Sequence, residues 1–334
     1  MREEQVGRGV TRLTSSTDVE INISKILGER YLHYRELWNK TFDVSNSPPV
    51  APIHLDVELQ DFCNQSCVMC PRNEEGHPSL PYDLGTKVHA DIDRLKGLIQ
   101  SGAERGLKSI NFGAFSEPLI NKRLWELIHF SHSCGLVDSR VITNGLLLDK
   151  YVEEVFSSGL VNLFISIDAN SEETYSKIRG KGFKKVLQNL ELVIGERERR
   201  NLLLPIIRVS FVDMDINQEE KLDFIDKWKN KVDHIDIQTW SNYRVPASEK
   251  ELLRERVFEC RNPWQRLSIT AKGDILPCCD FNGRVLVLGN IRTSDLQQAW
   301  DSEAMREVRE NLVNRTSKTC ETCQRGRGIQ LNEK

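Results

Sequence analysis

The chain of 334 residues contains 46 basic and 49 acidic residues, which gives a formal net charge of −3 at pH 7. A chain of this length can bury a sizeable core and can form one large domain with a small one beside it. Because the charges nearly balance, the chain has no strong positive electrostatic potential with which to bind a phosphate backbone. Nucleic acid is therefore not expected as a partner.

The N-terminus is polar and charged, Met1-Arg2-Glu3-Glu4-Gln5, and has no apolar core of signal-peptide length. No later apolar run approaches the roughly 18 residues of a membrane span, so we expect a cytoplasmic protein without a membrane partner. Eight of the nine cysteines gather at residues 63–70 and 260–323. In a reducing compartment this clustering favours metal ligation over disulfides.

The first 50 residues are expected to form an N-terminal segment outside the main domain. Residues 1–20 are polar, and we expect them to be frayed. From about 19 to 42, apolar residues at spacings of three and four predict one amphipathic helix that packs on the outside of the main domain. The run Ser45-Asn46-Ser47-Pro48-Pro49 ends this pattern and leads into the first strand.

Residues 51–247 alternate between apolar, strand-like runs and helical stretches. The predicted strands cover residues 53–59, 109–112, 141–143, 163–167, 206–211 and 234–238. The predicted helices cover residues 87–105, 122–133, 149–158, 184–199 and 219–229. This alternation predicts an α/β fold with a parallel sheet joined by right-handed crossovers. The carboxyl ends of such strands carry the chemistry of a barrel.

A short loop directly after the first predicted strand contains Cys63, Cys67 and Cys70 in the pattern C-x3-C-x2-C. A tetrahedral structural zinc site needs four protein ligands. Three cysteines can instead hold three irons of a cubane cluster and leave the fourth iron open for a substrate or cofactor. A zinc knuckle remains the alternative interpretation of the triplet.

This cysteine loop resembles the signature of the radical S-adenosylmethionine (radical SAM) enzymes. The resemblance implies a partial (β/α)6 TIM-like barrel and a [4Fe-4S] cluster whose open iron is chelated by SAM. It also implies that SAM is cleaved to a 5′-deoxyadenosyl radical, with electrons from a donor such as flavodoxin or ferredoxin. Met69 stands where the family often has an aromatic residue, and its apolar, polarizable side chain is a tolerable replacement beside SAM.

Three strand ends and the stretch 175–180 carry residues that the same resemblance assigns to SAM binding. Glu117, in a segment that resembles the family's Gly-Gly-Glu, would receive the amino group of SAM, and Asn144 would form a wall of the pocket. Ser166 and Asp168 are two residues apart on a predicted strand, so they should share a face and bind the ribose. An Asp that only caps the next helix is the alternative. Arg179 would bind the SAM carboxylate.

Further residues reach the barrel mouth by their position alone. Arg208 on the fifth strand and residues 238–240 at the sixth are expected to meet the substrate.

The C-terminal part, residues 248–334, begins with a charged helical linker at 248–257 and contains a second cysteine set. Cys260, Cys278, Cys320 and Cys323 can complete one ligand set, with a hairpin at 267–270 and 274–276 and a helix at 295–311. This region resembles the Twitch domain, the shortened form of the SPASM domain, which binds one auxiliary [4Fe-4S] cluster. A zinc ribbon is the alternative, and Cys278 is preferred over Cys279 as the ligand on spacing.

Two cysteines lie outside the predicted ligand sets, and the whole pattern leads to three hypotheses about function. Cys134 is expected to be a buried structural thiol, and Cys279 is a candidate donor of a hydrogen atom to a substrate radical. The leading hypothesis is oxidation or epimerisation of a carbinol carbon in a polar small molecule such as an amino sugar or aminocyclitol. In length and tail the chain resembles the Twitch-bearing aminocyclitol dehydrogenases and the aminoglycoside epimerases. A maturase of ribosomally made peptides and a non-catalytic zinc protein are the alternatives.

Overall fold

The computed structural model describes residues 1–7, 10–15, 19–41, 47–73, 86–240, 260–314, 316–317 and 319–320. The predicted linker helix at 248–257 and Cys323 lie outside these residues. No helix in the described ranges combines the length and apolarity that crossing a membrane requires.

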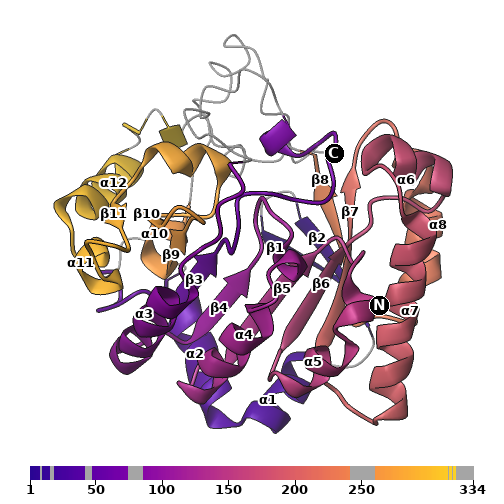
Figure 1. Ribbon diagram of the computed structural model, residues 1–334, viewed down its shortest axis with the longest axis horizontal. Coiled ribbons are helices and arrows are strands. Elements are labelled where there is room, and N and C mark those ends of the chain that lie inside the picture. The colour runs from indigo at the N-terminus through magenta and orange to yellow at the C-terminus, as the bar shows by residue number, and fades with distance from the viewer. Residues whose placement is uncertain are drawn as a thin grey trace.

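One eleven-stranded sheet organises the described chain, in the order β1-β2-β8-β7-β6-β5-β4-β3-β9-β10-β11 (Figure 1). Its six central strands are parallel, as predicted. They are β3 (His54–Val57), β4 (Ser109–Phe112), β5 (Asp138–Thr143), β6 (Asn162–Ser166), β7 (Ile206–Asp213) and β8 (His234–Thr239). The fold class is confirmed as a parallel α/β sheet that remains an open, partial barrel, because β1 and β11 form its two edges.

Helices cover the outer face of the parallel strands (Figure 1). They are α3 (Ile92–Arg105), α4 (Leu124–Ser133), α5 (Val152–Ser157), α6 (Glu172–Ile178), α7 (Phe183–Arg199) and α8 (Lys221–Trp228). Short 3-10 helices are η1 (Pro71–Asn73), η2 (Pro118–Ile120), η3 (Leu148–Lys150) and η4 (Gln218–Glu220). Fully buried strand residues such as Leu55 and Leu163 pack against helix residues such as Leu98 and Leu190 in one core. Burying such side chains stabilises the fold by about 1.5–3 kcal/mol each.

Residues 2–7 and 10–14 form strands, so the expectation that residues 1–20 are frayed was wrong for these two segments. β1 (Arg2–Gly7) and β2 (Val10–Thr14) form a hairpin, and β2 pairs antiparallel with β8. Arg12 of β2 makes a two-pronged ion pair with Asp236 of β8, with distances of 2.7 and 2.9 Å. Such planar, doubly hydrogen-bonded pairs fix the geometry of an edge strand.

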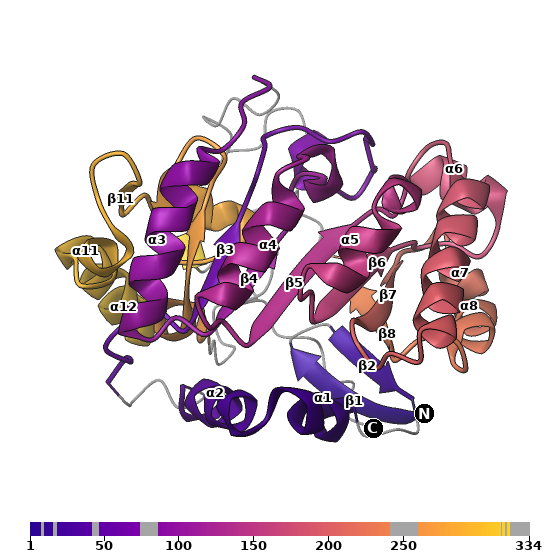
Figure 2. The ribbon, with the colours of Figure 1, turned by 60° about the horizontal axis from the view of Figure 1, so that its bottom comes forward.

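The predicted single helix at 19–42 is two helices, α1 (Val19–Leu27) and α2 (Glu29–Lys40). Gly28 separates them with φ of 69°, a conformation that suits glycine and interrupts a helix. Both helices lie across the amino-terminal ends of the parallel strands (Figure 2). Val19, Ile23 and Tyr34 pack there against apolar residues at the starts of β3, β5 and β7. The helices thus close the floor of the open barrel.

The C-terminal part continues the main sheet. β9 (Arg266–Ile269) pairs parallel with β3, and β10 (Asp274–Leu276) pairs antiparallel with β9 and β11 (Gly289–Asn290). The hairpin prediction is confirmed. The predicted helix at 295–311 is broken into α11 (Leu296–Trp300) and α12 (Glu303–Val313), where the Ser302 side chain caps α12. α10 (Asn262–Gln265) and the 3-10 helix η5 (Phe281–Val285) complete this part.

Candidate active site

The cysteine loop lies beyond the carboxyl end of β3, as expected for the active end of a parallel sheet. Backbone hydrogen bonds hold it in place, since the Val68 amide donates to the Ile178 carbonyl at 2.9 Å. Cys67 is buried, and Cys63 and Cys70 are half-buried. Burial raises the pKa of the Cys70 thiol to about 11, so a bound metal is needed to make it a thiolate at neutral pH.

Two side chains point hydrogen-bond donors at the sulfur atoms of this loop. Arg179 Nη1 lies 3.7 Å from Cys67 Sγ, and Asn144 Nδ2 lies 4.0 Å from Cys63 Sγ. Hydrogen bonds to cysteine sulfurs stabilise iron–sulfur clusters and tune their potentials. Asn144 also donates to Asn64 Oδ1 at 2.7 Å, which orients its amide. The surroundings therefore suit negatively charged thiolates.

The three cysteines do not converge on one point. Within the described residues, no group of three His, Cys, Asp or Glu side chains could hold a single metal ion. Each cysteine of a cubane binds a different iron, so a cluster does not require such convergence, whereas a zinc knuckle does. The arrangement of Cys63, Cys67 and Cys70 is thus compatible with ligands to three irons of one cluster.

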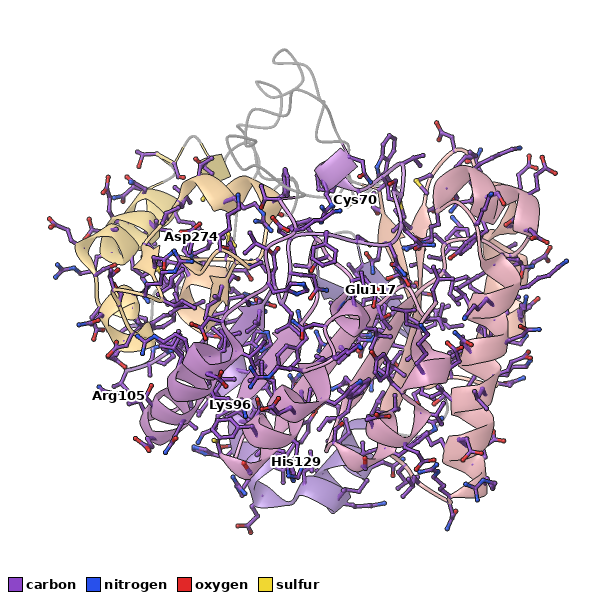
Figure 3. The ribbon with its side chains drawn as sticks, in the orientation of Figure 1. Cys70, Lys96, Arg105, Glu117, His129 and Asp274 are labelled. Atoms are coloured by element: carbon purple, nitrogen blue, oxygen red, sulfur yellow. The ribbon has the colours of Figure 1, made fainter. Side chains whose placement is uncertain are left out.

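Glu117 lies on the inner side of the cysteine loop and is 2% exposed. Its carboxylate accepts hydrogen bonds from the Asn144 amide at 2.8 Å, the Thr143 hydroxyl at 2.6 Å and the Leu119 amide at 3.1 Å. Burial nevertheless raises the pKa of Glu117 to about 7. Figure 3 shows Glu117 and Cys70 at the same end of the molecule. The side chain is a carboxylate that a nearby positive charge would hold ionised.

Gly113 opens the segment that brings Glu117 to this place. Its φ is 152°, and a Cβ there would approach Ile142 Cβ to 2.8 Å. The glycine therefore allows the chain to pass close to β5 before it turns into η2. The role of Glu117 in binding SAM stays a prediction.

Ser166 and Asp168 do not share a strand face, so that prediction was wrong. β6 ends at Ser166, and Asp168 has φ of 63°, which turns its side chain out of the strand pattern. Asp168 has no exposed surface. Its Oδ1 accepts from the Val212 amide at 2.9 Å, and its Oδ2 accepts from Arg179 Nε at 2.7 Å. This placement suits a positioning role for Asp168, while ribose binding by Ser166 stays a prediction.

Arg179 follows α6 and is held between Asp168 and Cys67. Contact of Arg179 with the SAM carboxylate stays a prediction. Asn217 is a residue that the sequence did not reveal. It donates 2.8 Å hydrogen bonds to the carbonyls of Asp168 and Val212, and it accepts from the Met214 amide. Only the fold brings it to Asp168, 49 residues away in sequence.

The inner face of the sheet is polar along most strands. Alternate positions carry His54, Asp56, Asn111, Arg140, Asn162, Arg208, Ser210, His234 and Asp236, most of them buried. The opposite face is apolar, so the period-two alternation of polar and apolar residues was a signal in the sequence.

Arg208 was predicted at the mouth, and this was wrong. It is the third residue of β7, near the floor, and donates to Asp236 at 3.3 Å. Gln238 and Thr239 end β8 and Trp240 follows them, so their contact with substrate stays a prediction. Met69 is half-buried on the cysteine loop, beside Cys70.

The second cysteine set approaches the inner face next to β3. A pocket there is lined by Asp56, Glu58, Phe115, Ser268, Cys278, Cys279 and Arg284, among others. Arg266 Nη1 lies 3.7 Å from Cys279 Sγ and 3.1 Å from Asp56 Oδ2. Glu58 and Arg284 form a buried ion pair across the same boundary. The thiol proposed as a hydrogen-atom donor thus lines a pocket that combines charged side chains with apolar ones such as Phe115 and Leu276.

Three of the four predicted auxiliary ligands, Cys260, Cys278 and Cys320, are half-buried, and the fourth lies outside the described residues. Whether Cys278 or Cys279 is the ligand stays a prediction. Cys134 ends α4 and is half-buried, so the expectation of a buried thiol was wrong.

Two family models match the chain. Residues 57–199 match the Radical SAM superfamily, and residues 260–324 match SPASM, described as an iron–sulfur cluster-binding domain. A SAM-binding [4Fe-4S] cluster, SAM and an auxiliary cluster are therefore the cofactors.

Curated relatives include the GTP 3′,8-cyclase of Alkaliphilus metalliredigens, 31% identical over 41% of this chain and 42% of that protein. The molybdenum cofactor biosynthesis protein moc-5 of Caenorhabditis elegans is 27% identical over 55% of this chain and 29% of that protein. The chain thus spans less than half the length of these relatives. They do not bear the names of aminocyclitol or aminoglycoside enzymes, so the expected likeness to that subgroup is not shown.

Solved structures share the fold. BtrN in complex with AdoMet and 2-DOIA has a TM-score of 0.53 and 19% identity, covering 81% of this chain and 92% of that one. Streptococcus suis SuiB has a TM-score of 0.59 and 13% identity, covering 90% and 77%. anSMEcpe with bound AdoMet has a TM-score of 0.56 and 14% identity, covering 83% and 88%. At these sequence identities, the structural similarity supports the fold of this chain and nothing beyond it.

Proposed function

The chain carries a radical SAM domain and a SPASM domain, and from this premise we propose that it is an oxidoreductase acting on a carbinol carbon. The substrate is a polar small molecule, which the enzyme oxidises or epimerises after abstracting its carbinol hydrogen. An amino sugar or aminocyclitol is the class that the sequence suggested. The observation that carries the proposal is the polar inner face of the sheet, which ends below the cysteine loop and beside the second cysteine set.

The chain's own residues prepare the upper end of this site. When bound, the cluster and SAM supply the radical that abstracts hydrogen. Cys63, Cys67 and Cys70 would hold the iron, and Arg179 would donate a hydrogen bond to one of their sulfurs. Glu117, surrounded by three donors and buried, would accept the amino group of SAM. An electron donor such as flavodoxin or ferredoxin would serve this site.

The lower and lateral parts of the site would bind the substrate. Asp56 and Ser268 can accept or donate hydrogen bonds to hydroxyl groups in the pocket beside Cys279. The second cysteine set would hold the auxiliary cluster close to this pocket, where it can accept one electron from a substrate that has lost hydrogen. Removal of a hydrogen atom, an electron and a proton converts a carbinol to a carbonyl, which balances as an oxidation.

Two other functions are supported by specific findings. Curated relatives are named GTP 3′,8-cyclase, which favours a nucleotide substrate for this chain. A peptide substrate is the second, because the fold is shared with SuiB bound to precursor peptide SuiA. Both would use the same hydrogen abstraction and differ in what the inner face must recognise.

Deuterium transfer tests the proposed function. The protein, reconstituted without oxygen, should hold about eight irons per chain if both sets bind cubanes. A candidate polyol labelled at its carbinol C–D position should then pass deuterium into 5′-deoxyadenosine, while a variant with Cys67→Ala should not. Iron content near eight without deuterium transfer from any of a panel of sugars, cyclitols and their phosphates would refute the carbinol proposal.

A further inference from the structure

The floor of the barrel holds a group of arginines that outnumber their carboxylate partners. Arg12, Arg140 and Arg208 lie on the inner face of β2, β5 and β7, with Asp138 and Asp236 between them. Three guanidinium groups thus face two carboxylates. His234 adds no charge, because burial and the neighbouring arginines lower its pKa to about 3.

Both carboxylates already have partners other than Arg140. Asp138 Oδ2 accepts from the Tyr34 hydroxyl at 3.2 Å, and its Oδ1 accepts from Asn162 Nδ2 at 2.7 Å. Asp236 accepts hydrogen bonds from Nε and Nη2 of Arg12 and from Nη1 of Arg208. Asp236 is thus shared by two arginines, whereas the donors to Asp138 are neutral, and together the two acids offset only two of the three guanidinium charges.

Arg140 is the arginine of this group whose side chain is unpaired. The side chain makes no hydrogen bond or ion pair with any residue that the structure describes, and its Nε is buried without a partner. The pairing register sets Arg140 level with Asn111 of β4 on one side and with Asn162 of β6 on the other. Its side chain is half-buried, so part of it remains accessible.

Arg208 provides a second unsatisfied donor on the same face. It is 7% exposed, its ring neighbour is Phe164 at 5.0 Å, and its Nε is buried without a partner. Burial lowers the pKa of Arg208 to about 9, and the charges of Arg12 and Arg140 act in the same direction. A buried, unpaired guanidinium N–H costs about 1–3 kcal/mol, more when charged, unless a ligand or water satisfies it.

We propose that Arg140 and Arg208 form an anion-binding site on the barrel floor that takes a phosphate or carboxylate group of the substrate. This deepens the proposed function, on which it rests for the identity of its ligand as the substrate. An anion there neutralises the surplus positive charge and accepts from both orphaned Nε atoms. Guanidinium groups suit such oxyanions because they combine charge with directed donors. Within the proposed class, this floor favours an amino sugar or aminocyclitol that also carries a phosphate or carboxylate group, because an ammonium group alone would be repelled by the arginines.

Binding of inorganic phosphate to the reconstituted protein tests the site without any turnover. Titration calorimetry should detect phosphate binding to the wild type, and Arg140→Gln should weaken it roughly tenfold or more, the effect of losing one charged hydrogen bond. Arg140→Lys should restore part of the affinity. Arg105→Gln, which removes an exposed arginine at the end of α3, should bind phosphate like the wild type (Figure 3).

Parallel titrations with acetate and succinate distinguish a carboxylate ligand from a phosphate, and preference for either supports the site. Equal affinity for phosphate in wild type and Arg140→Gln, or no binding of any of these anions by the wild type, overturns it. Arg140 has no partner to lose, so Arg140→Gln should keep the wild-type iron content and thermal midpoint. Failure of deuterium transfer with intact phosphate binding would refute the carbinol chemistry while leaving the anion site standing.

Discussion

Replacement of Glu117 by glutamine is expected to reduce SAM binding and to remove its dependence on pH. The glutamine keeps the shape of the side chain but cannot carry the negative charge that would face the amino group of SAM. Losing one charge-assisted hydrogen bond of this kind costs about 2 kcal/mol, roughly a thirtyfold change in affinity. The Asn144 amide donates to Oε2 and the Leu119 amide to Oε1, so glutamine, with one oxygen, keeps one of these hydrogen bonds and loses the other. The thermal midpoint of Glu117→Gln is therefore measured beside its affinity for SAM.

The pH dependence follows from the raised pKa of Glu117, about 7 instead of 4.5. SAM with its positive charge binds the ionised form, so the affinity is reduced by the fraction of protein that is protonated. With a pKa of about 7, the ionised fraction rises from about 0.1 at pH 6 to about 0.9 at pH 8, which predicts about a tenfold gain in affinity. The gain appears as the pH rises because an acid releases its proton in that direction.

Equilibrium binding of SAM to the reconstituted protein, measured from pH 6 to 8, checks both statements. Glu173→Gln is the matched control, because Glu173 is an exposed acid on α6 paired only with Lys177. This control should show the same tenfold rise as the wild type. If the wild type binds SAM equally at pH 6 and 8, or if Glu117→Gln keeps the wild-type slope, the reasoning about the buried carboxylate is wrong.

Three further changes test the second cysteine set, the thiol and the core. Gly283→Ala would place a Cβ 2.3 Å from Cys278 Sγ, so iron content should fall from about eight to about four per chain, while Gly97→Ala, in open space on α3, should keep all eight. Cys279→Ala should retain both SAM cleavage and oxidised product; cleavage without product would instead indicate a thiol that donates hydrogen, as an epimerase requires. Leu98→Ala should lower the free energy of unfolding by about 2–5 kcal/mol, measured by denaturant titration.

The parallel core could be predicted because each strand carries its own local signal. The predicted strand at 109–112 matches β4, and the predicted helix at 184–199 lacks only the first residue of α7. The N-terminal hairpin had no such signal, since β1 and β2 are polar and take their stability from β8. The ion pair that holds β2 joins Arg12 to a residue 224 positions away.

The same contrast governs the candidate site. The cysteine loop is a local pattern, so its place after β3 followed from the sequence. Asp168 was put on a strand face because the alternation rule assumes extended backbone, and its left-handed conformation breaks that assumption. Arg140 was overlooked because β5 begins with three polar residues, Asp138-Ser139-Arg140, so the predicted strand started only at residue 141. A single strand also does not show which charges remain unpaired after the sheet forms.

The sheet also explains how two cysteine sets far apart in sequence can serve one substrate. β3 pairs with β4 on one side and with β9 on the other, so the C-terminal part is an extension of the same sheet. Asp56 of β3 binds Arg266 of β9, and Glu58, just beyond β3, binds Arg284 of η5. Breaking a buried ion pair by removing one partner costs about 3–5 kcal/mol, so these contacts resist separation of the two parts. The second cysteine set is thereby fixed relative to β3 and to the cysteine loop that follows it, as an electron transfer between a substrate and an auxiliary cluster would require.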